Sequence, residues 1–296
     1  YLGTSQVVYR SSNGEAVDFV EYSQINDVLL FATPHGFAFA AWKNGKLNLL
    51  AEYAGAIKSA HFNQGNCWVA LNIGVLHIDL NKLTTPLIIG LNDRAYDVVL
   101  DESTQTIYAA MSDGLYLKPQ GNEAYKYSLE GKEINASTIE YTDEKVFVGC
   151  SNGDVFVFEQ DKIAQSFSLE SPVRKMIAGE RVVFVKTLDA GYLYDWIDET
   201  WVVMNAKLGY DHQSIIDATY YQQEFFFVQD VGITPVKTAD MLVEQPALDV
   251  TLLDVLYGGE STSKGVFPYS KSNFVFRFGV ATLKYQDQVR YQYQLI

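Results

Sequence analysis

Six glycine-centred segments recur along the chain at nearly constant spacing. The glycines stand at positions 36, 74, 114, 153, 191 and 232, so consecutive copies are 38, 40, 39, 38 and 41 residues apart. Each glycine follows one apolar run and precedes another, as residues 146–149 and 154–158 do in the fourth copy. A period of this length indicates a repeat architecture in which every repeat is one supersecondary unit.

The order of segments inside the repeat favours strands. In the fourth copy two further segments, residues 163–169 and 173–177, follow the first pair, which gives four strands in about 39 residues. Asn-Gly or Asp-Gly pairs in two copies supply the positive φ that a tight hairpin needs. A helical repeat would place apolar residues at i, i+3, i+4 and i+7 instead. We therefore predict an all-β fold, with a β-propeller of four-stranded blades over residues 1–246.

A seventh, partial unit lies at the N-terminus. Residues 2–10 align with the strand–turn–strand core of the repeat, with Gln6 in the place of the glycine. Six full units and a partial one predict seven blades. Because an open ring would leave two bare sheet edges, we expect a strand from the C-terminal side to complete the partial blade.

Residues 247–296 have a different pattern. Residues 249–257 and 273–280 are predicted strands, and Phe274, Phe276 and Phe278 alternate onto one face of the second. Residues 289–295 alternate in the same way. This pattern predicts the first part of an Ig-like β-sandwich, truncated where the chain ends. The chain opens without Met or a signal-like segment, and we expect it to be an excised part of a longer protein.

Composition and motif content exclude several functions. The net charge of −14 without a Lys/Arg cluster argues against nucleic-acid binding. No run of about 18 apolar residues is present, so we expect membrane attachment only through segments outside this chain. The four histidines and two cysteines lack metal-ligand spacing, which predicts no metal and no cofactor. Cys67 and Cys150 lie on strands two units apart and are predicted to be buried free thiols.

No catalytic residue is predicted, and we expect this part of the protein not to be an enzyme. The acidic pairs Asp101-Glu102 and Asp143-Glu144 both fall in turns between a first and a second strand. Their repetition indicates solvated turn residues rather than an acid/base pair.

A ligand site is predicted on one face of the ring. In a propeller, the loops that enter each first strand and the loops that join second and third strands gather around the same end of the channel. Basic side chains there, in a chain of net charge −14, favour an acidic saccharide. The candidate ligand-binding residues on this face are His35, Lys58, Arg94, Tyr96, Asp113, Arg174, Lys175, Asp189, His212 and Asp230.

Two features together resemble a known family. The blade core of residues 108–116 and 146–156 resembles the two-component regulator propeller repeat. The Asn-Phe-x-Phe-x-Phe strand at 273–278, followed by Tyr285, Tyr291 and Tyr293, resembles the start of a Y_Y_Y domain. That order of domains is typical of the periplasmic sensor region of hybrid two-component histidine kinases.

The resemblance implies a ligand-sensing module of a membrane-bound receptor in an inner membrane. It implies a small-molecule or oligosaccharide ligand, a homodimer in the full receptor, and a histidine kinase output or, less commonly, a diguanylate cyclase. Two alternatives stay open from the residues. One is an autonomous propeller scaffold that binds proteins or polysaccharide. The other is a propeller glycosidase or lyase that uses Tyr96, His212 and Asp230.

Overall fold

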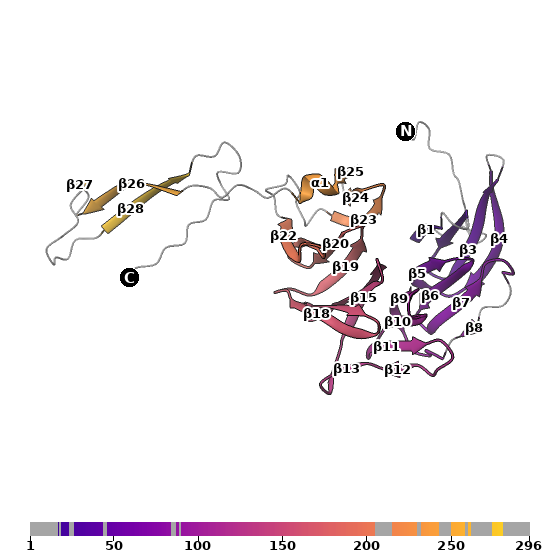
Figure 1. Cartoon of the computed structure of the whole chain (residues 1–296). Coiled ribbons are helices and arrows are strands. Elements are labelled where there is room, and N and C mark those ends of the chain that lie inside the picture. The colour runs from indigo at the N-terminus through magenta and orange to yellow at the C-terminus, as the bar shows by residue number, and fades with distance from the viewer. Residues whose placement is uncertain are drawn as a thin grey trace.

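The computed structural model contains six antiparallel sheets that follow one another along the chain as blades (Figure 1). It describes residues 17, 19–23, 27–43, 46–83, 87–88, 90–204, 215–229, 232–242, 250–257, 260–261 and 274–280. In each blade the strands run in sequence order as a meander, so every strand pairs with the one before it. The prediction of an all-β propeller is confirmed.

The first three blades have four strands each. Their bounds are β1 (Phe19–Ser23), β2 (Val28–Ala32), β3 (Gly36–Lys43), β4 (Lys46–Ala54); β5 (Ile57–Asn63), β6 (Asn66–Leu71), β7 (Gly74–Asp79), β8 (Leu87–Ile88); and β9 (Ala95–Asp101), β10 (Thr106–Met111), β11 (Gly114–Pro119), β12 (Tyr125–Lys126). A short hairpin, β13 (Ser128–Leu129) and β14 (Lys132–Glu133), follows the third blade.

The remaining blades complete the series. Their bounds are β15 (Ala136–Thr142), β16 (Lys145–Cys150), β17 (Asp154–Glu159), β18 (Lys162–Ser168); β19 (Val173–Ala178), β20 (Val182–Thr187), β21 (Gly191–Asp195), β22 (Thr200–Met204); and β23 (Ile215–Tyr221), β24 (Glu224–Gln229), β25 (Gly232–Lys237). The four-residue helix α1 (Thr238–Met241) follows the sixth blade.

The described residues therefore form six blades, not the seven that we predicted, and the sixth has three strands rather than four. Each repeated glycine accounts for one blade. The partial unit at residues 2–10, from which the seventh blade was inferred, lies outside the described residues.

Two of the repeated glycines, Gly74 and Gly153, have a clear steric cause. Gly74 adopts φ 135°, and a Cβ there would lie 2.1 Å from the carbonyl oxygen of Leu91. Gly153 adopts φ 95°, and its Cβ would lie 2.3 Å from the carbonyl oxygen of Leu169. At both turns the backbone that leads into the next blade passes directly over the glycine. Only a residue without a side chain fits there.

The blades are held together by packing of sheet on sheet. Five hydrophobic clusters join consecutive blades, from the first pair to the fifth and sixth. The second strands are covered on both faces, which explains continuous apolar runs such as Val146–Cys150 in β16. The outer strand β18 alternates between exposed and half-buried residues instead. None of these five clusters of described residues joins the sixth blade to the first.

Hydrogen bonds to the carboxylate of Asp161 reinforce the junction of the third and fourth blades. Asp161, in the turn between β17 and β18, accepts hydrogen bonds from the hydroxyls of Thr106 at 2.9 Å and Tyr108 at 2.8 Å. Thr104 lies at 3.3 Å from the same carboxylate. Tyr108 and Thr106 are fully buried, so the carboxylate satisfies hydroxyls that water does not reach.

The C-terminal segment contains one small sheet within the described residues. It has the strands β26 (Val250–Tyr257), β27 (Glu260–Ser261) and β28 (Phe274–Val280), with β26 in the centre. The two strands predicted over 249–257 and 273–280 are present and pair antiparallel. A second sheet, which an Ig-like sandwich requires, is not found among the described residues, so the sandwich is not confirmed. The strand predicted over 289–295 and the tyrosines 285, 291 and 293 lie outside them.

Where the structure describes the chain, no helix is long and apolar enough to cross a membrane.

Candidate functional site

The first strand of each blade lines the centre of the propeller. β1 contacts β5, and the contacts continue from β5 to β9, β15, β19 and β23. First strands of neighbouring blades touch because they are the innermost elements of a radial arrangement. Their side chains therefore define the central channel.

Five of these strands carry a β-bulge at the same position. In β5, Ile57 pairs with Leu71 and Ser59 with Ala70, so Lys58 is the extra residue. The same shift recurs in the third to sixth blades. The bulged residues are Lys58, Tyr96, Ser137, Arg174 and Ile216. Because a bulge re-aims its side chain, these five residues mark one end of the channel, which we call the channel mouth.

The channel mouth contains three of the predicted ligand-binding residues. Lys58, Tyr96 and Arg174 are exposed bulge residues of three different blades. Arg94 is also exposed, and its guanidinium carbon lies 5.1 Å from the centre of the Tyr96 ring, which is a cation–π contact. The Tyr96 ring is therefore held in place while part of it faces solvent.

The other predicted residues are distributed differently. His35 and Asp189 are exposed in turns between second and third strands. Asp113 accepts a hydrogen bond from the Tyr116 hydroxyl at 2.9 Å and lies 3.3 Å from the Lys126 ammonium, so its charge is already compensated. His212 and Asp230 lie outside the described residues.

The residue after each bulge connects one blade to the next. The hydroxyl of Ser59 accepts a hydrogen bond from the amide of Val98 at 3.2 Å. Asp97 accepts one from the Ile139 amide at 2.8 Å and another from the Thr138 hydroxyl at 3.1 Å. In the second and third blades the bulge thus exposes one side chain, Lys58 or Tyr96, at the channel mouth and aims the next one at the neighbouring blade, whereas in the fourth blade the bulge residue Ser137 itself donates to the carbonyl oxygen of Val173 at 2.9 Å.

Lys175 is the residue after the bulge in the fifth blade, and the structure places it inside the channel. It forms an ion pair with Asp217 of the sixth blade, whose carboxylate also accepts the Ala218 amide at 2.7 Å. Both side chains remain accessible to solvent, so the pair lies in a wet channel. Lys175 therefore joins two blades and is less available to a ligand than Lys58 or Arg174.

Three carboxyl groups line the channel near Lys175. Burial, and then the nearby Asp97 carboxylate, raise the pKa of Glu21 to about 8, although Lys175 acts in the opposite direction. Burial also raises the pKa of Asp97 against the effect of its hydrogen bonds. Glu140 has its pKa raised well above the ordinary value by burial and by the charges of Asp97 and Glu21. The three groups repel one another, and the interior of the channel disfavours anions.

Sequence reasoning missed these three carboxylates. Each is an acidic residue in the interior of a strand, as Glu21 is in β1, Asp97 in β9 and Glu140 in β15. That position was a usable signal, because a carboxylate inside a strand of the fold needs a specific partner or a wet surface. The prediction for Asp101 was wrong as well. Asp101 is 1% exposed and accepts hydrogen bonds from Ser103 and Thr104, so it stabilises its turn from inside.

The described histidines and cysteines give no sign of a metal centre. Among the described residues no group of three or more His, Cys, Asp or Glu side chains is placed to hold a metal ion. His61 packs against the rings of Trp68 and Tyr141, and burial lowers its pKa to about 4. Cys67 and Cys150 are buried and free, as predicted.

Comparison with known proteins identifies the fold and no closer relationship. No protein-family model and no curated protein matches the chain. The extracellular domain of the hybrid two-component system BT4673 of B. thetaiotaomicron is 13% identical with a TM-score of 0.61, over 88% of this chain and 38% of that one. PorZ, a surface component of the type-IX secretion system of Porphyromonas gingivalis, is 10% identical with a TM-score of 0.57, over 76% of this chain and 31% of that one.

A eukaryotic propeller is equally similar. The WD40 domain of Neurospora crassa Pan2 is 8% identical with a TM-score of 0.58, over 79% of each chain. Likeness at such identities shows a shared β-propeller fold alone. This chain spans between three and four tenths of the length of PorZ and of the BT4673 domain.

Proposed function

We propose that the chain is the extracytoplasmic ligand-sensing module of a membrane-bound signalling receptor, and that it binds an acidic oligosaccharide across the channel mouth. The observation that carries this proposal is the recurrent bulge, which presents Lys58, Tyr96 and Arg174 from three blades at one end of the channel. Ammonium and guanidinium groups bind carboxylates or sulfates, and a fixed aromatic ring packs against a sugar face.

The charge distribution supports binding across the mouth rather than inside the channel. Glu21, Asp97 and Glu140 line the interior, and two of the cations there are engaged, with Lys175 paired to Asp217. Lys186 donates to the carbonyl oxygen of Ile215. The raised pKa values of these carboxyl groups indicate that the interior disfavours negative charge, whereas the exposed cations at the entrance attract an anionic ligand.

The wider role rests on the resemblance of the repeat and on the propeller in the extracellular domain of BT4673. In this proposal the module lies in the periplasm and the segment after residue 246 begins a Y_Y_Y-type sandwich. The full receptor is a dimer with a histidine kinase or diguanylate cyclase output, and this module itself performs no catalysis. An autonomous scaffold that binds polysaccharide would use the same mouth but would lack a membrane segment in the full reading frame.

Calorimetric titration with oligogalacturonides and heparin fragments tests the site. The double variant K58E/R174E reverses the two cations at the bulges, and K162E reverses one exposed cation on the outer strand β18. We expect the double variant to bind at least tenfold more weakly, which corresponds to about 1.4 kcal/mol, and K162E to bind like the parent. Equal affinity of both variants, or no binding of any acidic oligosaccharide, would contradict the proposal.

A further inference from the structure

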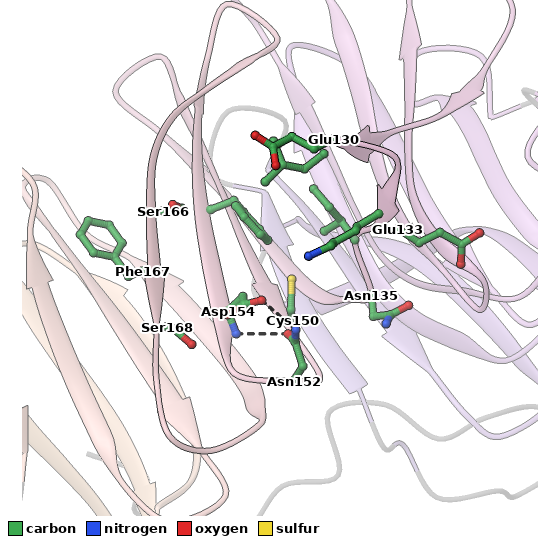
Figure 2. Close-up of a pocket in the computed structure, with 13 residues that line it drawn as sticks. Glu130, Glu133, Asn135, Cys150, Asn152, Asp154, Ser166, Phe167 and Ser168 are labelled. Carbon is green, nitrogen blue, oxygen red and sulfur yellow. Dashed lines mark hydrogen bonds between the residues drawn. The ribbon is translucent and has the colours of Figure 1, made fainter.

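A pocket of about 430 Å³ lies between the β13–β14 hairpin and the fourth blade, away from the channel (Figure 2). The hairpin follows a third blade that has almost no outer strand. β12 has two residues, and the chain then forms the β13–β14 hairpin, which lies across the pocket from the fourth blade. The volume falls within the range of roughly 300–1,000 Å³ that is typical of small-molecule sites.

The lining of the pocket is polar around a small apolar base. Figure 2 shows Ser166 and Ser168 on one side, Asn135 on the other, and Cys150 and Asn152 between them. The apolar contribution comes from Leu129, Ile134, Cys150 and Phe156, whereas the Phe167 ring points away from the pocket and packs against Tyr194 and Trp201 of the fifth blade (Figure 2). Asp154 and the hairpin residues Glu130, Lys132 and Glu133 complete the polar lining.

The polar groups of Asn152 and Asp154 are held in position in the absence of a ligand. The Asn152 side-chain amide donates to the Asp154 carboxylate at 2.7 Å, and the Asp154 amide donates back to Asn152 at 3.2 Å. The Ser151 amide donates to the Asn135 carbonyl at 3.0 Å, which ties this turn to the segment after the hairpin. Groups held in this way lose little freedom when they bind.

We propose that this pocket binds a saccharide unit without acidic groups. Amide, hydroxyl and carboxylate groups in one small space supply the mixed donors and acceptors that vicinal hydroxyls require. Of the three carboxylates among the lining residues, Glu133 is paired with Lys126 at 2.7 Å, so the charges of Glu130 and Asp154 stand against the single ammonium of Lys132. This excess of negative charge excludes a uronic acid or a sulfated sugar, so the preference is opposite to that of the channel mouth.

A thiol introduced by S166C reports on occupancy. Ser166 is exposed and lines the pocket, whereas Ala164 is an exposed residue of the same strand that does not line it, so A164C is the control. Both native cysteines are buried, and burial raises the pKa of Cys150 to about 12, so they react slowly with Ellman's reagent. The labelling rate at neutral pH therefore measures the introduced thiol.

The probes are maltose, cellobiose, chitobiose and digalacturonate. We expect at least one of the first three, at millimolar concentration, to slow labelling of the S166C variant at least fivefold and to leave the A164C variant unchanged. Digalacturonate should protect neither. If all three leave the S166C rate unchanged, or if digalacturonate protects as well as they do, the proposal is wrong.

A second variant tests the contribution of Asn152 and Asp154. N152A removes the amide that orients Asp154, and in the S166C background it should weaken protection roughly tenfold. The same protein must keep its circular dichroism spectrum and its midpoint of urea denaturation within error. Protection that N152A leaves unchanged would show that the saccharide binds elsewhere, which would also overturn the proposal.

Discussion

The channel carboxyl groups make stability depend on pH in an unusual direction. Burial and the Asp97 charge raise the pKa of Glu21 from the ordinary value of 4.5 to about 8. Between these two values the folded protein holds a proton that the unfolded chain has released. The free energy of unfolding therefore falls as the pH rises from 4.5 to 8, whereas ion-paired carboxylates give the opposite slope.

The size of the effect follows from the pKa difference. A rise from 4.5 to about 8 corresponds to roughly 5 kcal/mol, at 1.36 kcal/mol for each pKa unit. Glu21 is half-buried and faces a channel that also contains the accessible Lys175–Asp217 pair, so solvent screening should reduce this to about 1–2 kcal/mol. E21Q removes the charge and keeps the shape of the side chain. It should match the parent at pH 5 and exceed its stability by about 1–2 kcal/mol at pH 8.5.

Urea denaturation followed by tryptophan fluorescence at pH 5, 6.5 and 8.5 measures this difference. E144Q is the control, because Glu144 is an exposed residue of the turn between β15 and β16. The free energy of unfolding of E144Q should change with pH in parallel with that of the parent. If the E21Q profile is also parallel to the parent over the whole range, the reasoning about buried channel charges is refuted.

Three further predictions concern the framework. D161A should lower the free energy of unfolding by about 2–3 kcal/mol in chemical denaturation, because two buried hydroxyls lose their acceptor; adding Y108F to D161A should then cost less than Y108F costs alone. G153A should cost more than 2 kcal/mol, since its Cβ would meet a carbonyl oxygen at 2.3 Å, and G121A, with open space around it, should cost about 1 kcal/mol. Both native thiols should resist Ellman's reagent in the folded protein and react within minutes in urea; rapid reaction without denaturant would show that the blade cores open.

The repeat could be recognised from sequence because its cause is local. At Gly74 and Gly153 the turn needs a positive φ, and another backbone segment packs directly against the residue. Only glycine fits there, so these glycines are visible in the sequence as part of the repeat. The second strands are equally easy to recognise, because both of their faces are covered and their sequences are continuous apolar runs. These two signals were sufficient to predict the all-β propeller and the length of its repeat.

The channel could not be predicted in the same way, because it depends on register between strands. A bulge is invisible in the sequence until the pairing of Ile57 and Ser59 with the next strand is known. Lys58 and Arg174, which were predicted in the entering loops, are the extra residues of the bulges in β5 and β19. Their neighbour Lys175 follows the bulge and points into the channel, where it pairs with Asp217. The pocket between the β13–β14 hairpin and the fourth blade was not predicted, because the period alone did not reveal the hairpin.

Hydrogen–deuterium exchange with and without an acidic oligosaccharide tests the central claim most directly. Ligand bound across the channel mouth should slow exchange at the beginnings of β5, β9 and β19, where Lys58, Tyr96 and Arg174 lie, and leave the outer strand β18 unchanged. Slower exchange confined to outer strands, or no change at any of the three bulges at saturating ligand, would contradict the assignment of the channel mouth as the sensing site.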